Sequence, residues 1–129
     1  KLSDVRRYIS YKVAWEIAQN NPWTGVGIGD LKNEATRIYA RDYPQQLVLY
    51  PHNFFLTLFA AVGLPGLIIF SICFFGPLLY QKNYQNLFFL LFYCCISLSM
   101  LTENTFLIDK VVALHCGFLM MSLHHLKKE

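Results

Sequence analysis

A run of 28 residues without a charged side chain, at 53–80, limits most strongly how this chain can fold. As one straight helix, the run would be about 42 Å long, which exceeds the roughly 30 Å of a bilayer's hydrocarbon core. The sequence Gly63-Leu64-Pro65-Gly66 lies inside the run and provides a place to break it. We therefore expect a short interfacial helix at 53–62, followed by a spanning helix at about 65–80.

Two further apolar runs make the second half of the chain resemble a membrane protein. Hydrophobic residues make up 55% of the sequence and charged residues 15%, against about 25% charged in an average soluble domain. The runs predict spans at about 87–104 and 109–126. Both are short for a lipid span, and such a run is equally compatible with a buried helix. A small soluble helical protein with a large core therefore stays an alternative.

The distribution of charge favours the membrane interpretation. Three crossings would place Lys82 and the basic tail at 124–128 on one side, as the positive-inside rule requires. Residues 1–51 and the turn at 102–104 would then share the opposite, outer side. Seven of the eleven Lys and Arg residues precede position 51. They either balance the five acidic residues of the same region or bind an anionic ligand.

Residues 1–51 have a mixed composition, which predicts a loop region outside the membrane with two amphipathic helices. The first helix should begin at Ser3-Asp4, which can cap its amino end, and should end near Asn20, ahead of a proline. The second helix should run from Leu31 to Arg41, with Asp30 as its cap.

The first helix should have two distinct faces. One carries an apolar residue at every fourth position and can pack against the rest of the protein. About 160° away, at 100° per residue, lie Arg7, Tyr11 and Trp15. The simplest interpretation of Arg7 is a solvated surface residue. As a functional residue it would bind phosphate, because guanidinium forms a planar pair of hydrogen bonds with that group.

The polar pair His52-Asn53 lies where the loop region meets the charge-free run. In the simpler interpretation the pair only starts a helix, with Asn53 satisfying a free backbone N–H. In the functional interpretation His52 lies at the membrane boundary and takes a proton from a hydroxyl, since imidazole is well suited to proton exchange at neutral pH.

The remaining motifs carry little functional signal. Gly25, Gly27 and Gly29 lack the spacing, preceding strand and following acid of a dinucleotide loop, so a turn with positive φ and backbone exposed near a ligand fits better. The four cysteines lie in apolar runs without metal-ligand spacing, which predicts packing residues. A net charge of +3, without basic runs interleaved with aromatics, argues against nucleic acid as a partner.

Four features follow one another in a fixed order. Arg7 stands 15 residues before a Pro-x-x-Gly-x-Gly turn at 22–27. His52-Asn53 precedes a hydrophobic helix, which contains the Gly-Leu-Pro-Gly break, and Leu-Thr-Glu at 101–103 lies at the turn between the last two predicted spans, where the span at about 87–104 ends. Together these features resemble the C-terminal part of the O-antigen ligase and O-antigen polymerase superfamily. That family often has Trp four residues after the Arg, where this chain has Tyr11.

The resemblance implies an all-α membrane glycosyltransferase of the GT-C type in the bacterial inner membrane, with its active site facing the periplasm. Such enzymes move a glycan from undecaprenyl pyrophosphate to an acceptor sugar, without a metal, another cofactor or a nucleotide sugar. The acceptor is lipid A–core in a ligase and a second lipid-linked repeat unit in a polymerase, and the sequence leaves this choice open.

The resemblance also implies roles for individual residues. His52 becomes the candidate base or acceptor-orienting residue, and Arg7 becomes the candidate pyrophosphate ligand. Asn53, Arg6 and Glu103 are supporting candidates, although Glu103 could simply cap the turn between spans. A preplaced Arg would stabilise the charge that develops on the departing pyrophosphate.

The family's earlier spans carry a further basic residue that this chain lacks. Since the sequence begins with Lys1 and has no signal peptide, we expect a C-terminal segment of a longer protein that is inactive alone. The non-enzymatic alternative is a transporter or scaffold segment in which His52 is only a helix cap.

Overall fold

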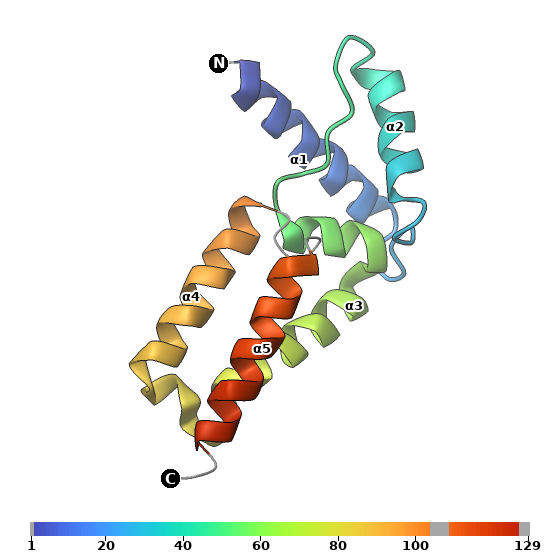
Figure 1. The fold of residues 1–129 in the computed structure, drawn as a ribbon. Coiled ribbons are helices and arrows are strands. Elements are labelled where there is room, and N and C mark those ends of the chain that lie inside the picture. Colours follow the sequence, from blue (N-terminus) through green and yellow to red (C-terminus); the bar gives the residue numbers. More distant parts are fainter. Residues whose placement is uncertain (1, 104–108, 127–129) are drawn as a thin grey trace.

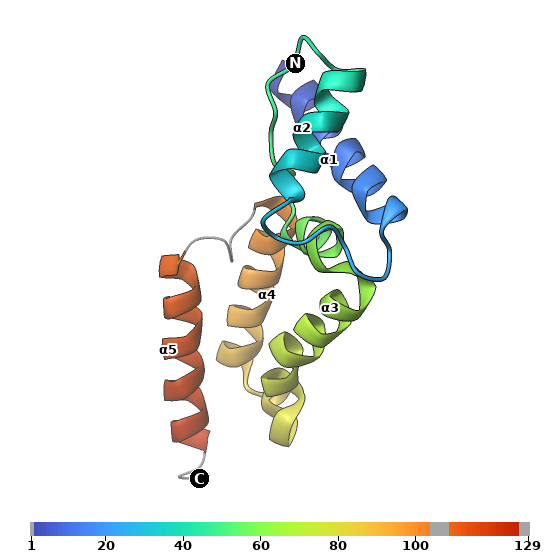
Figure 2. The ribbon, with the colours of Figure 1, turned by 90° about the vertical axis from the view of Figure 1, so that its right-hand side faces the viewer.

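The computed structural model describes residues 2–103 and 109–126, and this part of the chain is helical (Figure 1). The predicted all-α class is therefore confirmed. Figures 1 and 2 show α1 and α2 at one end of the molecule, and the second half of α3 with α4 and α5 at the other. The elements are α1 (Leu2–Asn20), α2 (Leu31–Asp42), α3 (Phe54–Leu79), the 3-10 helix η1 (Tyr80–Gln85), α4 (Leu87–Thr102) and α5 (Asp109–Leu126).

The helices lie close to their predicted ranges, and Asp30 occupies the predicted N-cap position of α2, but its side chain forms no cap and Ser3-Asp4 does not precede its helix. The first helix already begins at Leu2, so Ser3-Asp4 lies inside its first turn. Asp30 precedes α2 but is itself in the helical region (φ −93°, ψ −11°), and its side chain makes no capping hydrogen bond. A capping side chain needs the extended backbone. Asn53 has it (φ −156°, ψ 111°), and its Oδ1 accepts the N–H of Leu56 at 3.0 Å.

Among the described helices, α3 alone is long and apolar enough to cross a membrane by length and composition. It has 26 residues and a mean hydropathy of 2.4. A second apolar helix, α4, has 16 residues and falls short of that length, so the three predicted crossings stay a prediction. The predicted end of the second span at residue 104 and the tail residues 127–128 lie outside the described part.

The long helix α3 bends at the predicted Gly-Leu-Pro-Gly break. Gly63 leaves the helical conformation (φ 72°, ψ −175°). In an unbroken helix, the N–H of Leu64 would donate to the carbonyl of Ala60, and the N–H of residue 65 would donate to the carbonyl of Ala61. Pro65 has no N–H to donate. The bend therefore leaves the carbonyls of Ala60 and Ala61 without their usual donors.

The loop before α2 supplies the missing hydrogen bonds. The N–H of Val26 donates to the first of these carbonyls at 3.1 Å, and the N–H of Gly27 donates to the second at 2.8 Å. In return, the N–H of Leu64 donates to the carbonyl of Pro22 at 2.8 Å. Three backbone hydrogen bonds thus join the loop to the bend of α3.

Glycine is required where the loop and the bend meet. Gly25 and Gly27 have φ values of +63° and +88°, which confirms the predicted positive-φ turn. A Cβ atom on Gly25 would lie 2.3 Å from the backbone of Ala61, and one on Gly63 would lie 2.5 Å from the backbone of Trp23. The amides of this turn were expected to face a ligand, and they bind α3 of the same chain instead.

Two apolar clusters form the core, and the first half of α3 contributes to both. One cluster packs α1 and α2 against α3, and the other packs α3 and α4 together with α5. In the second cluster, the rings of Phe92 and Phe118 stack with centroids 3.6 Å apart. Buried members of the first cluster are Ile9, Val13, Ile17, Ala18, Leu31, Ala35, Ile38, Tyr39, Ala60 and Ala61; those of the second are Phe54, Phe74, Phe89, Tyr93 and Met100.

Large apolar side chains are exposed along the outer faces of α3, α4 and α5. Exposed apolar side chains in this number are unfavourable in water and are typical of helices that contact lipid or another protein. The four cysteines were predicted to be packing residues, and this is wrong, because all four are exposed on these helices. The exposed apolar residues include Ile68, Ile69, Ile72, Leu79, Leu87, Phe88, Leu91, Leu98, Leu101 and Leu114.

Replacing Gly25 with alanine should destabilise the protein by about 2 kcal/mol or more, because the new Cβ meets backbone and the residue has positive φ. Thermal unfolding of the detergent-solubilised protein measures the change. Gly29→Ala is the matched control, since a Cβ there meets nothing within 4 Å. Equal unfolding temperatures for the two variants would contradict this account of the loop.

Candidate functional site

His52 lies on the short segment that connects α2 to α3, and α1 holds its backbone in place. The hydroxyl of Tyr11, on α1, donates to the carbonyl of His52 at 2.9 Å. On the other side of His52, the side chain of Asn53 caps α3. The backbone of His52 is therefore held between two helices, while its imidazole is 34% exposed.

The imidazole of His52 contacts a carboxylate from the distant end of α4. Its Nδ1 atom lies 2.8 Å from Oε2 of Glu103, a residue 51 positions later. The side chain of Glu103 is 53% exposed, so the pair is open to solvent and to a ligand. Glu103 was predicted only as a supporting residue. Its direct contact with the candidate base His52 was not predicted.

Arg7 lies one helical turn before Tyr11 on the same face of α1, and its side chain is exposed. The hydrogen bond from His52 is the main reason that the pKa of Glu103 lies below its ordinary value, and electrostatic interactions with His52 and with the positive charge of Arg7 also lower it. The guanidinium is thus within electrostatic range of the pair. Among the described residues, no hydrogen bond or ion pair joins Arg7 to His52 or to Glu103.

The two remaining candidates stand apart from this cluster. Asn53 uses its side-chain oxygen to cap α3, as in the simpler of its two interpretations. Arg6 is exposed on α1, and it lies 100° around the helix axis from Arg7. The structure therefore brings His52 and Glu103 into contact, with Arg7 near enough to affect the charge of Glu103, and it leaves Arg6 facing another direction.

Two other basic residues of the loop region are engaged with acids. Arg37 lies 2.9 Å from Glu34 on the same helix. Arg41 contacts both Glu16 and Asp42 at 2.6 Å, and its hydrogen bond lowers the pKa of Asp42. These two basic residues of the loop region therefore balance acidic residues on the surface, which was one of the two roles expected for the basic residues of 1–51.

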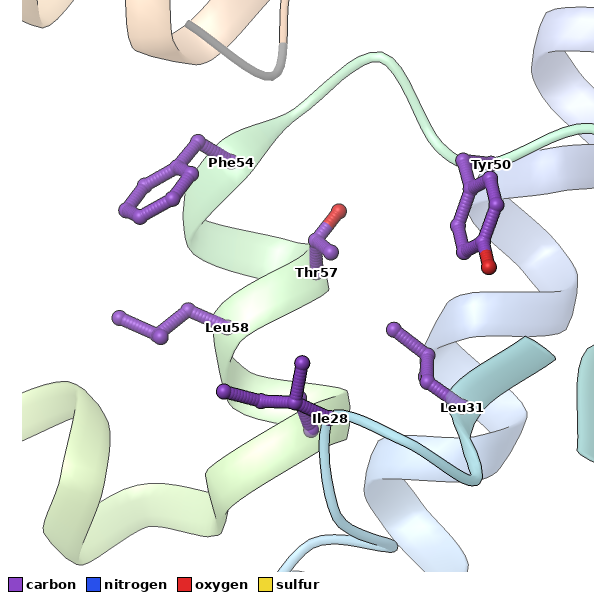
Figure 3. Close-up of a pocket in the computed structure, with 7 residues that line it drawn as sticks. Ile28, Leu31, Tyr50, Phe54, Thr57 and Leu58 are labelled. Atoms are coloured by element: carbon purple, nitrogen blue, oxygen red, sulfur yellow. The ribbon is translucent and has the colours of Figure 1, made fainter. Parts of the chain in front are cut away.

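An apolar pocket of about 230 Å³ lies beside the first half of α3. Figure 3 shows Leu31 and Tyr50 on one side of it and Phe54 and Leu58 on the other. Two of its lining residues, Tyr50 and Thr57, carry hydroxyl groups, and that of Thr57 donates to the carbonyl of Asn53 at 2.9 Å. The other lining residues are apolar, so the pocket suits a mainly apolar group. No pattern in the sequence predicted this pocket. Its lining residues are Ile28, Leu31, Tyr50, Phe54, Thr57, Leu58 and Ala61.

A family model described as O-antigen ligase matches residues 1–71. The matched range contains α1, α2 and the bend of α3, and with them Arg7, the glycine turn and His52. No curated protein and no solved structure matches the chain.

Removing the hydroxyl of Tyr11 should loosen the segment around His52. In Tyr11→Phe, the lost hydrogen bond is expected to reduce the local opening free energy by about 1 kcal/mol. Amide hydrogen exchange at 50–56 should then be about five times faster. Tyr8→Phe serves as the control, because Tyr8 is 66% exposed on the same helix. Unchanged exchange in Tyr11→Phe would show that α1 does not hold this segment.

Proposed function

Because the chain belongs to the O-antigen ligase family, we propose that it transfers a lipid-linked glycan to an acceptor sugar. The family comprises membrane-bound O-antigen ligases and polymerases. The proposed donor is a glycan on undecaprenyl pyrophosphate, and the proposed acceptor is lipid A–core at the periplasmic face of the bacterial inner membrane. A second lipid-linked repeat unit as acceptor would make the protein a polymerase of the same family.

One observation supports this function most: the candidate base His52 contacts the carboxylate of Glu103, and the cation Arg7 lies within electrostatic range of the same carboxylate. His52 enters from the segment before α3, and Arg7 enters from α1, close enough to affect the same carboxylate. Glycosyl transfer needs both kinds of group. The acceptor hydroxyl must lose a proton, and the leaving pyrophosphate must have its developing negative charge stabilised.

The proposed reaction assigns one task to each residue. The acceptor oxygen forms a bond to the anomeric carbon of the glycan while the bond from that carbon to the pyrophosphate oxygen breaks. His52 takes the proton of the acceptor hydroxyl, and Arg7 binds the pyrophosphate through its planar guanidinium. The step uses no metal and no nucleotide sugar.

We further propose that residues 1–51 form a periplasmic loop region and that residues 52–129 form the membrane part. The first half of α3, at 53–62, would lie in the interface, followed by spans at about 65–80, 87–104 and 109–126. Figures 1 and 2 support this order of crossings, because the end of α4 and the start of α5 lie at the same end of this helical part as the start of α3, with η1 at the opposite end. The apolar outer faces of these helices would contact membrane lipids.

His52→Ala and Arg7→Ala should each lower glycan transfer by at least about 100-fold in the full-length protein, the usual contribution of a general base or of a charge-stabilising group. Surface polysaccharide and protein level are measured together. Arg37→Ala is the control, since Arg37 is paired with Glu34 on α2. Normal polysaccharide in both site variants would refute the function.

Lipopolysaccharide from a deletion strain distinguishes the two acceptors. On a gel, bare core indicates a lost ligase or a lost glycan supply, whereas core with a single repeat unit indicates a lost polymerase. His52→Asn tests the non-enzymatic alternative, in which His52 is only a cap and this substitution is tolerated. Recovery of the protein in an aqueous fraction without detergent would contradict the membrane assignment.

A further inference from the structure

We propose that Glu103 is a positioning residue, whose carboxylate fixes the imidazole of His52 so that its Nε2 atom faces the acceptor hydroxyl. The inference rests on the proposed function and deepens it. It is carried by the contact of 2.8 Å between Nδ1 of His52 and Oε2 of Glu103. No spacing rule links these residues, because they are 51 positions apart.

The contact determines where the ring carries its proton. An ionised carboxylate only accepts hydrogen bonds, so the imidazole nitrogen that contacts it must donate. The hydrogen bond from His52, together with the positive charge of Arg7, keeps the pKa of Glu103 below its ordinary value, and the carboxylate is therefore ionised at neutral pH. A neutral His52 ring then carries its hydrogen on Nδ1, and Nε2 has the free electron pair that a base requires.

The same carboxylate stabilises the ring after proton transfer. When Nε2 takes the proton of the acceptor hydroxyl, His52 becomes a cation with a hydrogen on each nitrogen. Glu103 then lies next to a positive charge and forms a charge-assisted hydrogen bond with it. The proton is later released from Nε2 to water, which restores the starting state of the ring.

Rigid elements hold both partners of this contact. Glu103 directly follows α4, and its N–H donates to the carbonyl of Ser99 at 2.8 Å. Three residues before it, Met100 is fully buried in the second apolar cluster. On the opposite side, Tyr11 holds the carbonyl of His52. Since α1 and α4 each anchor one residue, the orientation of the ring follows from the packing of both helices.

Because the His52–Glu103 pair is exposed, its effect on the orientation of the His52 ring can be distinguished from an effect on the stability of the fold. With side chains 34% and 53% exposed, the attraction between the two charges is screened by water and adds little to folding. Loss of the carboxylate should therefore leave the protein folded while the imidazole becomes free to rotate and to exchange tautomers. That difference can be measured.

The test compares Glu103→Ala, Glu103→Gln and Glu103→Asp in the intact, membrane-embedded protein. Glu103→Ala should lower kcat by about 10-fold to 100-fold, within the total contribution of a general base, with little change in KM for the donor. Glu103→Asp keeps the charge and should restore part of the rate. Glu103→Gln keeps the size and loses the charge, so its rate should fall between those of the other two variants.

Glu34→Gln is the matched control, because Glu34 is an acid of the loop region whose partner is Arg37 rather than the site. Its kcat should equal that of the wild type. If Glu103→Ala keeps the wild-type kcat while His52→Ala is inactive, the positioning role is wrong and the proposed function stands. If both variants keep full activity, the proposed function itself is wrong.

Nitrogen NMR of the ¹⁵N-histidine-labelled protein gives a readout that does not depend on the reaction. The His52 signals, identified by their absence in His52→Gln, should show hydrogen on Nδ1 in the wild type at a pH where the ring is neutral. In Glu103→Ala they should move toward the tautomer with hydrogen on Nε2, which free imidazole side chains prefer. An unchanged tautomer would overturn the proposal even if the variant lost activity.

Discussion

Three backbone hydrogen bonds at the bend of α3 hold the two parts of this protein together. A bent helix leaves carbonyl groups without donors, and an unpaired polar group in apolar surroundings costs several kcal/mol. Here the amides of Val26 and Gly27 bind those carbonyls, and the carbonyl of Pro22 accepts the N–H of Leu64. Because the backbones approach so closely, Gly25 and Gly63 have no room for a side chain. The position of α1 and α2 relative to α3 follows from this contact.

The candidate site depends on that arrangement. With the loop fixed on α3, the first helix passes over the start of α3, where Tyr11 reaches the carbonyl of His52. The second apolar cluster independently places the end of α4 at the same point, where Glu103 meets the imidazole. Two separate packing interactions thus bring His52 and Glu103 into contact, with Arg7 on the helix that holds the backbone of His52, at the boundary between a polar loop region and an apolar set of helices. A substrate with a charged head and a lipid tail meets both environments at such a boundary.

Most of the local structure could be predicted, because it follows from neighbouring residues. The helix ranges follow from apolar periodicity and from prolines, and the bend follows from the Gly-Leu-Pro-Gly sequence. The failures of Ser3-Asp4 and Asp30 as caps show the limit of such rules, since capping depends on the backbone conformation as well as on the residue type. The cysteines were wrongly predicted to be packing residues, because an apolar run does not reveal which face of the helix is buried.

The sequence by itself determined the helices, the break, the positive-φ glycines, the family resemblance and the candidates Arg7 and His52. Only the tertiary structure decided that the glycine turn binds α3, that His52 contacts Glu103, and that a pocket opens between Ile28 and Tyr50. The physical reason is distance along the chain. Backbone preferences and periodicity act over a few residues, whereas contacts between residues 30 or 50 positions apart depend on how whole helices pack.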